Sequence, residues 1–210
     1  MSIAAVIVGI NGWKEYTQPL LGAFNEYDPG IDVVCVDNQS DPPYPTDRRT
    51  FRCDTRCGYG DAINQGIQTA GKHDWYLVMN NDIELSGSIS HKINELDPDK
   101  LYGFDLHHIH NVPDSDYLQG WALIISHKVW STVGLFDEKF EVTWFDDVDY
   151  SWRAKQAGFE LERLPRGSYN LLHFGKDRPD WTEFRSQHRG AYDKNRAYLL
   201  VKHGLLKGDQ

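Results

Sequence analysis

Three apolar runs near the start of the chain restrict its possible folds more than any other feature. They cover residues 3–10, 31–36 and 75–79, with a single charged residue among them. Continuous runs of this kind are typical of strands that are buried on both faces of a sheet. The segments 15–26 and 58–71 lie between them and repeat apolar residues at helical spacing. Strands and helices that alternate in this way predict parallel strands joined by crossover helices.

Short polar side chains follow each of these three runs. Asn11 follows the first, Asp37 the second, and Asn80-Asn81-Asp82 the third. The carboxyl ends of parallel strands meet at one edge of an open α/β sheet, where ligands usually bind. Oxygen ligands of this kind suit Mg²⁺ or Mn²⁺ better than zinc. For the tripeptide alone, the alternative is a polar turn that ends a strand. Three such ends together predict a ligand site at this edge.

The second half of the chain has a different pattern. We expect helices at 87–96, 127–133 and 146–158, a β-rich stretch at 101–126, and short strands at 51–53, 159–164 and 169–173. A helical tail is expected at 179–203. The predicted organisation is one domain over residues 1–175, with halves at about 1–85 and 86–175, and a C-terminal helical tail, 176–210, packed on the same domain.

Three carboxylates lie at the predicted start of the helix at 146–158. Asp146, Asp147 and Asp149 fall within four residues, where the free amides of a helix N-terminus stabilise anions and so depress their pKa values. Asp149 can pair with Arg153 one turn later, whereas Asp147 points about 100° away from Asp146 and is free for another partner. One of them is a candidate general base that takes a proton from an attacking hydroxyl. The alternative is a capped, solvated helix start with Asp146 as the N-cap.

His173 ends the predicted strand at 169–173. A single His in such a place more often packs or faces solvent, but beside a cation site at Asp82 it would be a suitable nitrogen ligand for Mn²⁺. Gly58-Tyr59-Gly60 precedes a helix and could form a phosphate-binding turn, although it lacks both the G-x-G-x-x-G and the Walker patterns.

The composition argues against several classes of protein. With 22 basic and 31 acidic residues in 210, the net charge of −9 argues against a general binder of nucleic acid or membrane surfaces. No apolar segment approaches the length of about 20 residues that a membrane span needs, and the N-terminus lacks a signal-peptide pattern. We expect a soluble, cytoplasmic protein without stable membrane insertion, with peripheral membrane association left open. Cys35 is expected in the core, and Cys53 and Cys57 as reduced thiols.

Several short motifs occur in an order that resembles the family 2 glycosyltransferases, and most closely their bacterial rhamnosyltransferase-like branch. The resemblance covers about residues 3–175 and rests on Val8-Gly9-Ile10-Asn11, Val36-Asp37-Asn38-Gln39-Ser40, the segment 58–66, Asn80-Asn81-Asp82, Gly134-Leu135-Phe136-Asp137 and Asp146-Asp147-Val148-Asp149. It implies the GT-A fold, a Rossmann-like α/β arrangement with a mixed, mainly parallel sheet flanked by helices. It also implies a nucleotide-diphosphate-sugar donor, Mn²⁺ or Mg²⁺, and transfer with inversion at the anomeric carbon.

The resemblance also implies roles for individual residues on the donor side. Asn11 and Asp37 would contact the nucleoside, and Gly58 and Asn64 stand where the family packs against the nucleotide. Asn80-Asn81-Asp82 matches the family's D-x-D position, so that Asp82 would bind the metal that bridges the diphosphate. Asn80 replaces the first Asp of that motif, which removes one charge.

Further roles follow for the chemistry and for the acceptor side. Asp147 matches the base of the family's Glu-Asp motif, with Asp146 in place of the Glu, and both are catalytic candidates. His173 matches a His that often completes the metal shell. The candidates for the acceptor side are Trp121, Asp149 and Arg153.

Three functions are consistent with these patterns. The first is an inverting, metal-dependent glycosyltransferase that moves a sugar from a UDP-, GDP- or dTDP-sugar to a hydroxyl of a glycan, lipid-linked or other acceptor. A sugar nucleotidyltransferase is an alternative, although the Gly- and Lys/Arg-rich loop expected after its first strand is missing. A non-catalytic carbohydrate-binding module is another. Residues 176–207 carry eight basic and four acidic side chains. This excess of positive charge indicates either a solvated helix face or a surface that guides an anionic acceptor, of which nucleic acid is the least expected kind.

Overall fold

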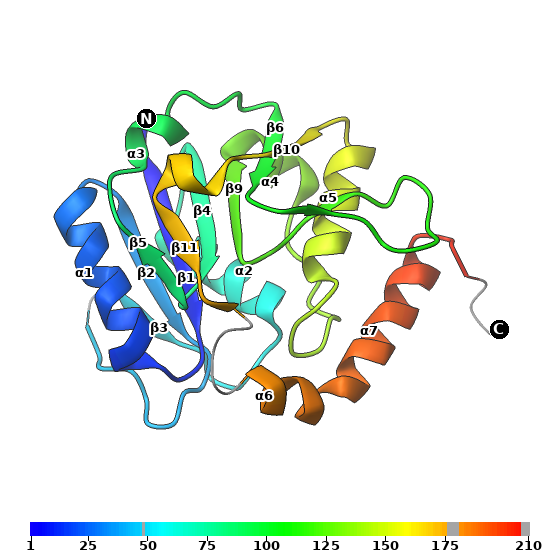
Figure 1. The fold of residues 1–210 in the computed structure, drawn as a ribbon, viewed down its shortest axis with the longest axis horizontal. Coiled ribbons are helices and arrows are strands. Elements are labelled where there is room, and N and C mark those ends of the chain that lie inside the picture. The colour runs from blue at the N-terminus through cyan, green and yellow to red at the C-terminus, as the bar shows by residue number, and fades with distance from the viewer. Residues whose placement is uncertain (48, 176–180, 207–210) are drawn as a thin grey trace.

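A seven-stranded mixed sheet forms the centre of the protein (Figure 1), in a computed structural model that describes residues 1–47, 49–175 and 181–206. The strand order is β10-β6-β9-β4-β1-β2-β3. The bounds are β1 Ile3–Gly9, β2 Asp32–Asp37, β3 Thr50–Arg52, β4 Trp75–Asn80, β6 Lys100–Gly103, β9 Ala122–Ser126 and β10 Glu160–Arg163. Strands β1 to β4 are mutually parallel, and only β9 runs antiparallel to its neighbours β4 and β6 among the described strands of this sheet. The predicted mixed, mainly parallel sheet is therefore confirmed.

Helices cover both faces of this sheet, as the alternation of buried side chains along β1 requires. One core cluster contains Ala5 and Ile7 with side chains of α1 (Gln18–Tyr27) and α3 (Ser90–Ile93). The other contains Ala4, Val6 and Val8 with side chains of three further helices. Those helices are α2 (Tyr59–Ala70), α4 (His127–Val133) and α5 (Asp146–Gln156). In Figure 1, α1 and α5 accordingly lie on opposite sides of the strands.

Helix α2 packs closely on the sheet because Gly66 has no side chain. A Cβ at Gly66 would lie 2.3 Å from Cγ1 of Val6 and 2.9 Å from Cγ2 of Val36. The helix backbone therefore rests directly on β1 and β2. This contact fixes the N-terminal end of α2 near the carboxyl ends of the parallel strands.

Two small antiparallel ladders extend the structure beyond the main sheet. Strand β5 (Ile83–Leu85) pairs with β11 (Leu171–His173), and β7 (Leu106–His107) pairs with β8 (Tyr117–Leu118). The first ladder brings the segment after β4 next to a strand that lies about ninety positions later in the chain, since Ile83 is opposite His173.

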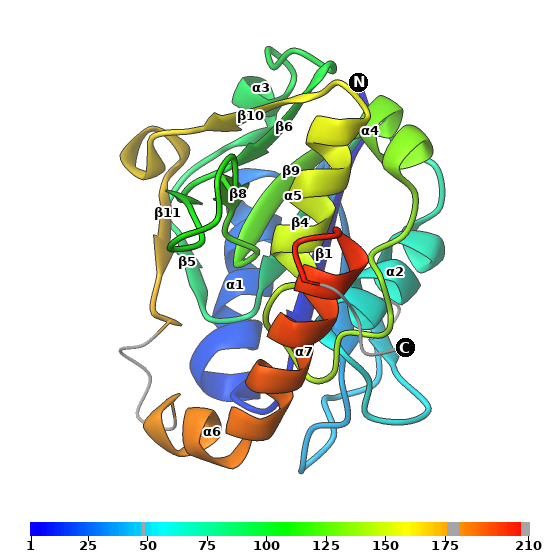
Figure 2. The ribbon, with the colours of Figure 1, turned by 90° about the vertical axis from the view of Figure 1, so that its right-hand side faces the viewer.

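The C-terminal part is helical and packs against α5. Its helices are α6 (Trp181–Gln187) and α7 (Arg189–Lys202), and residues 176–180 of the predicted tail lie outside the described residues. Leu199 of α7 joins Phe145, Val148 and Trp152 of the α5 region in a third apolar cluster. Figure 2 shows α7 running beside α5. No helix in residues 1–47, 49–175 and 181–206 is both long and apolar enough to cross a membrane.

Two predicted elements differ from the structure. The helix expected at 87–96 is reduced to α3, because the carboxylate of Asp28 binds the amide of Ile89 and the hydroxyls of Ser88 and Ser90. After α3 the hydrogen bonds change to the shorter i−3 pattern, and Pro98 cannot continue a helix. The strand expected at 169–173 is shortened to β11, since a 3₁₀ turn, η2 (Arg166–Tyr169), takes up its first residue.

Candidate functional site

The carboxyl ends of β1, β2 and β4 meet at one edge, as the polar strand ends predicted. The amide of Asn11 donates to Oγ of Ser40 at 2.8 Å, which joins the loops after β1 and β2. Nδ2 of Asn81 donates to the carbonyl of Asn11 at 3.1 Å, which joins the loops after β4 and β1. Three separate stretches of sequence therefore form one polar surface at this edge.

Asp37 stabilises this edge through the loop that follows it. Its side chain is fully buried and accepts the amides of Ser40 at 2.8 Å and Tyr44 at 3.1 Å. It also forms an ion pair with Arg52. Burial alone would raise the pKa of Asp37, but these hydrogen bonds lower it, so the carboxylate stays ionised.

The three residues of Asn80-Asn81-Asp82 point in different directions. Asn81 is buried, and its Nδ2 lies 3.0 Å from Oγ1 of Thr17 and 3.1 Å from Oη of Tyr44. Asn80 and Asp82 face His173 instead. Nδ2 of Asn80 is 3.5 Å from Nε2 of His173, and Oδ1 of Asp82 is 3.4 Å from the same nitrogen. Asn81 thus links the loops after β1, β2 and β4, whereas Asn80 and Asp82 lie next to His173.

Asp82 and His173 lie at a distance that two neighbouring ligands of one metal ion could have. Adjacent ligands of an octahedral cation bound at about 2.1 Å lie about 3 Å apart, close to the 3.4 Å observed. One carboxylate oxygen and one imidazole nitrogen suit Mn²⁺. Within the described parts of the chain, no three His, Cys, Asp or Glu side chains come together closely enough to hold a metal ion. Asp82 and His173 could supply two ligands, and phosphate and water oxygens could supply the rest, as is usual for Mg²⁺.

Asp146 and Asp147 form the second carboxylate group of the site. Asp146 is the first residue of α5, with Phe145 and not Asp146 at the N-cap position. Burial and the neighbouring charge of Asp147 raise the pKa of Asp146 to about 8. Burial also raises the pKa of Asp147, against the hydrogen bonds that it accepts from the amides of Gly120 at 2.8 Å and Val148 at 2.9 Å. The expected depression of these pKa values is wrong, because burial outweighs the helix N-terminus.

The turn before these carboxylates has an unusual backbone. Trp144 has a φ of 74° and Phe145 a φ of 72°, in the left-handed region that bulky residues rarely adopt. The side chain of Asn195 on α7 donates to the carbonyl oxygens of Glu141, Thr143 and Trp144 and holds the turn in place. Strained residues of this kind cluster at functional sites.

Tyr59 hydrogen-bonds to the residue that orients Asp147. Its hydroxyl donates to the carbonyl of Gly120 at 3.0 Å, and the amide of Gly120 donates to Asp147. Burial raises the pKa of Tyr59 well above its usual value, and so do the charges of Asp146, Asp82 and Asp147, in that order. Burial and these negative charges therefore keep the phenol protonated. The sequence predicts a phosphate-binding turn at Gly58-Tyr59-Gly60 but assigns no role of its own to Tyr59, which is the first residue of α2.

Gly58 and Asn64 both contact the segment that carries Gly134-Leu135-Phe136-Asp137. A Cβ at Gly58 would lie 2.4 Å from the carbonyl oxygen of Phe140. The Asn64 side chain accepts the amide of Phe136 and donates to its carbonyl, each at 2.9 Å. These contacts place the 134–140 segment against α2, next to the start of α5.

The three candidates for the acceptor side lie in two different places. Asp149 is fully buried and binds Arg153 Nε at 2.8 Å, Lys202 Nζ at 2.6 Å and His203 Nε2 at 2.9 Å. Arg153 also donates to two carbonyl oxygens of the 133–135 turn. Trp121 instead stacks flat on His173, with ring centroids 4.7 Å apart. The structure thus groups Trp121 with Asp82, and Asp149 and Arg153 with α7.

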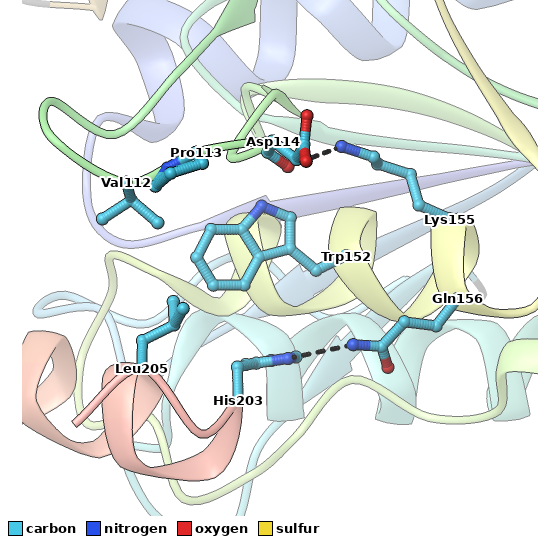
Figure 3. A pocket seen from close by; sticks show the side chains of 8 residues that line it. All are labelled: Val112, Pro113, Asp114, Trp152, Lys155, Gln156, His203 and Leu205. Atoms are coloured by element: carbon cyan, nitrogen blue, oxygen red, sulfur yellow. Dashed lines mark hydrogen bonds between the residues drawn. The ribbon is translucent and has the colours of Figure 1, made fainter. Parts of the chain in front are cut away.

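A separate hollow of about 200 Å³ lies at the other end of α5 (Figure 3). Trp152 lies across it, below the loop that carries Val112 and Asp114, and Lys155 donates to the carbonyl of Asp114 at 2.7 Å. None of the residues singled out in the sequence lines this hollow. The carboxylates, His173 and Tyr59 are therefore the candidate site.

Comparison with known proteins identifies the fold. No protein-family model matches the chain, and no curated protein matches its sequence. Among solved structures, GalNAc-T7 with UDP, GalNAc and Mn²⁺ matches 82% of this chain with a TM-score of 0.64 at 14% identity. The mannosyltransferase PcManGT from Pyrobaculum calidifontis, in complex with GDP-Man and Mn²⁺, matches 77% with a TM-score of 0.58 at 15% identity. The catalytic domain of Drosophila β1,4-galactosyltransferase 7, in complex with xylobiose, matches 85% with a TM-score of 0.57 at 13% identity.

The matches cover different shares of these proteins. The chain spans 44% of the GalNAc-T7 chain, 54% of PcManGT and 74% of the Drosophila domain. At these identities the similarity concerns the fold. The order of elements and the mainly parallel sheet agree with it. The chain has the GT-A fold.

Proposed function

We propose that the protein is an inverting glycosyltransferase that uses a nucleotide-diphosphate-sugar donor and a divalent cation. The observation that carries this proposal is that the backbone of Gly120 and Trp121 joins the two carboxylate groups. The amide of Gly120 donates to Asp147 at 2.8 Å, and the carbonyl of Trp121 accepts the amide of Asn80 at 2.9 Å, two residues before Asp82. A transfer reaction of this class needs a place for a diphosphate leaving group and a base for the attacking hydroxyl. Two separate carboxylate groups, joined through the backbone of Gly120 and Trp121, meet both needs.

The donor side of the proposal is the edge formed by Asn11, Asp37, Asn80 and Asp82. Amide and hydroxyl groups of these loops suit a nucleoside, and Asp82 with His173 would hold the cation. When bound, the cation neutralises the charge that develops on the departing diphosphate. The GalNAc-T7 and PcManGT structures contain UDP or GDP-Man together with Mn²⁺, which supports a donor and a cation of this class.

Asp147 is the proposed base. As the acceptor oxygen bonds to the anomeric carbon, the proton of the acceptor hydroxyl passes to the Asp147 carboxylate. The bond between the anomeric carbon and the diphosphate oxygen breaks, and its electron pair stays on the diphosphate. The amide of Gly120 orients this carboxylate, and a Cβ at Gly120 would lie 2.8 Å from Cβ of Asp147, so only glycine permits the approach. The raised pKa makes Asp147 a stronger base than an ordinary aspartate. Asp146, with a pKa of about 8, is mostly protonated at pH 7 and limits the charge of the pair.

The proposed acceptor is a hydroxyl group of a glycan, of a lipid-linked sugar or of another compound, which includes anionic ones. Basic side chains of the C-terminal helices bear on the anionic case. Arg185 and Arg189 are exposed, whereas Lys202 pairs with Asp137 at 2.7 Å and with Asp149 at 2.6 Å. Part of the positive charge of this region is therefore used within the fold.

Two measurements test the proposal together. Addition of UDP, GDP or dTDP with Mn²⁺ is expected to raise the melting temperature, and Asp82→Ala to remove the shift. Turnover of the matching nucleotide sugar is expected to fall by at least about 10²-fold in Asp147→Asn, the usual size of a general-base contribution, while the thermal shift is retained. Formation of a nucleotide sugar from a sugar phosphate would identify a nucleotidyltransferase instead. Sugar binding without turnover would favour the binding module, and no cation-dependent shift would contradict the cation site.

A further inference from the structure

The imidazole of His173 is held against two neighbours. The indole of Trp121 stacks on it with a centroid distance of 4.7 Å and an interplanar angle of 7°. The backbone of Gly175 lies close to the same ring, because a Cβ there would be 2.8 Å from Cε1 of His173. Gly175 also has a φ of +49°, which favours glycine. The ring therefore has little freedom to turn without moving one of these residues.

Trp121 is itself fixed by a charged pair. It is 3% exposed, and its Nε1 donates to Oδ2 of Asp105 at 2.8 Å. Asp105 forms an ion pair with Arg166, and the guanidinium carbon of Arg166 lies 5.0 Å from the centre of the Trp121 ring. Burial alone would raise the pKa of Asp105, but the hydrogen bonds from Arg166 and Trp121 lower it, so the pair stays charged.

The backbone near His173 does not by itself provide this rigidity. His173 is the last residue of β11, a strand of three residues that pairs only with β5 among the described strands. A two-stranded ladder of this length is marginal in water. Trp121 in contrast precedes β9, an interior strand of the seven-stranded sheet, and its carbonyl accepts the amide of Asn80 at 2.9 Å. The stack thus joins His173, which lies on a two-stranded ladder, to a residue next to a strand of the seven-stranded sheet.

We propose that Trp121, Asp105 and Arg166 are positioning residues that hold the imidazole of His173 in the orientation that binds the cation beside Asp82. The proposal rests on the proposed function for the presence of that cation. It changes the predicted role of Trp121 from an acceptor contact to a support of the metal site. Partners behind a metal ligand commonly change metal affinity by about 10–100-fold when removed, because a free side chain must be ordered on binding.

Arg166 is the residue to change, since its side chain is 45% exposed and its loss leaves the core intact. The test titrates Mn²⁺ into the full chain and follows the electron paramagnetic resonance signal of the free ion. Arg166→Gln is expected to weaken Mn²⁺ binding about 10-fold. The matched control, Arg163→Gln, removes an exposed arginine from β10 and should leave binding unchanged. Trp121→Leu removes the stacking ring itself and should weaken binding further.

A double-mutant cycle separates positioning from a general loss of structure. In a His173→Ala background, Arg166→Gln should cause no further loss of Mn²⁺ affinity, because its effect acts through the imidazole. An equal loss in both backgrounds would overturn the proposal, and so would unchanged affinity in Arg166→Gln and Trp121→Leu. If Asp82→Ala and His173→Ala also leave Mn²⁺ binding unchanged, the cation site of the proposed function fails as well. The two failures are therefore distinguishable.

Discussion

Asp146 is a carboxyl group in surroundings that disfavour its charge. It is 3% exposed, and its Oδ2 accepts no hydrogen bond from any residue of the described chain. The charge of Asp147 next to it adds to the penalty, and together they raise its pKa to about 8. An unfolded aspartate releases its proton near pH 4. Between these two values the folded chain binds a proton that the unfolded chain has lost.

The pH dependence of stability follows from this difference in bound protons. Because the folded state binds the extra proton, the contribution of Asp146 is most favourable below about pH 4 and is lost as the pH rises towards 8. Asp146→Asn removes this titration, so we expect the variant to melt at a higher temperature than the parent protein at pH 8. The expected difference is at least about 2–4 °C, which is the change in melting temperature that 1 kcal/mol causes in a chain of this size. The difference should shrink towards pH 4. Calorimetry of both proteins at several pH values tests this, and an advantage that grows towards acid pH would contradict it.

At the scale of elements, α2 organises one side of the site. Gly58, the N-cap of the helix, packs against the 140–142 segment, and Tyr59 bonds to that segment and to Gly120. Further along the helix, Asn64 binds Phe136, and Gly66 packs on β1 and β2. One helix thus sets the distance between the sheet edge and the segment that leads into α5. A change in how α2 packs should therefore affect both stability and the site.

Gly66→Ala tests this packing. The added methyl group would lie 2.3 Å from Cγ1 of Val6, so we expect a loss of about 1–3 kcal/mol in the free energy of unfolding. Gly22→Ala in α1 is the matched control, since a Cβ there meets nothing within 4 Å. That variant should gain about 0.5–1 kcal/mol, because alanine is the better helix former. Denaturant unfolding measures both, and a Gly66→Ala protein as stable as the parent would show that α2 can move away from the sheet.

Much of this arrangement was accessible from the sequence, and the reason is local. The apolar runs, their polar ends and the acidic start of α5 are each contained in a few consecutive residues, so spacing alone predicts them. The stack of Trp121 on His173 and the hydrogen bond from Tyr59 to Gly120 depend on segments that are far apart in the chain. The shortened α3 has the same origin, because Asp28 captures residues that lie 60 to 62 positions later. Side-chain burial, which raises the pKa values of Asp146 and Asp147, is likewise set only by the folded whole.

At the scale of the whole molecule, a buried carboxylate joins the C-terminal helix to the rest. Asp149 of α5 binds Lys202 and His203 at the end of α7 as well as Arg153 on its own helix. Next to it, Asp137 accepts the hydroxyl of Tyr198 at 2.7 Å and pairs with Lys202. Helix α7 also holds the strained turn before Asp146 through Asn195. The C-terminal helix is therefore part of the support of the site.

Asp149→Ala is expected to lower the free energy of unfolding by about 1–3 kcal/mol, because it leaves Arg153, Lys202 and His203 without the buried carboxylate that they share. Asp193→Ala, an exposed position on α7, should stay within about 0.5 kcal/mol of the parent. Chemical unfolding followed by circular dichroism compares the two. Equal stabilities for both variants would show that the ion pairs of Asp149 contribute little to holding α7.

The hydrogen bond from Tyr59 to Gly120 joins residues 61 positions apart, and the contact between Asn80 and His173 joins residues 93 positions apart. Contacts of such separation slow folding, because a long loop must close before the contact can stabilise anything. The candidate site is therefore complete only when these distant segments have come together. When the chain refolds from denaturant, cation binding should return with the slowest phase, after most of the helical signal has recovered.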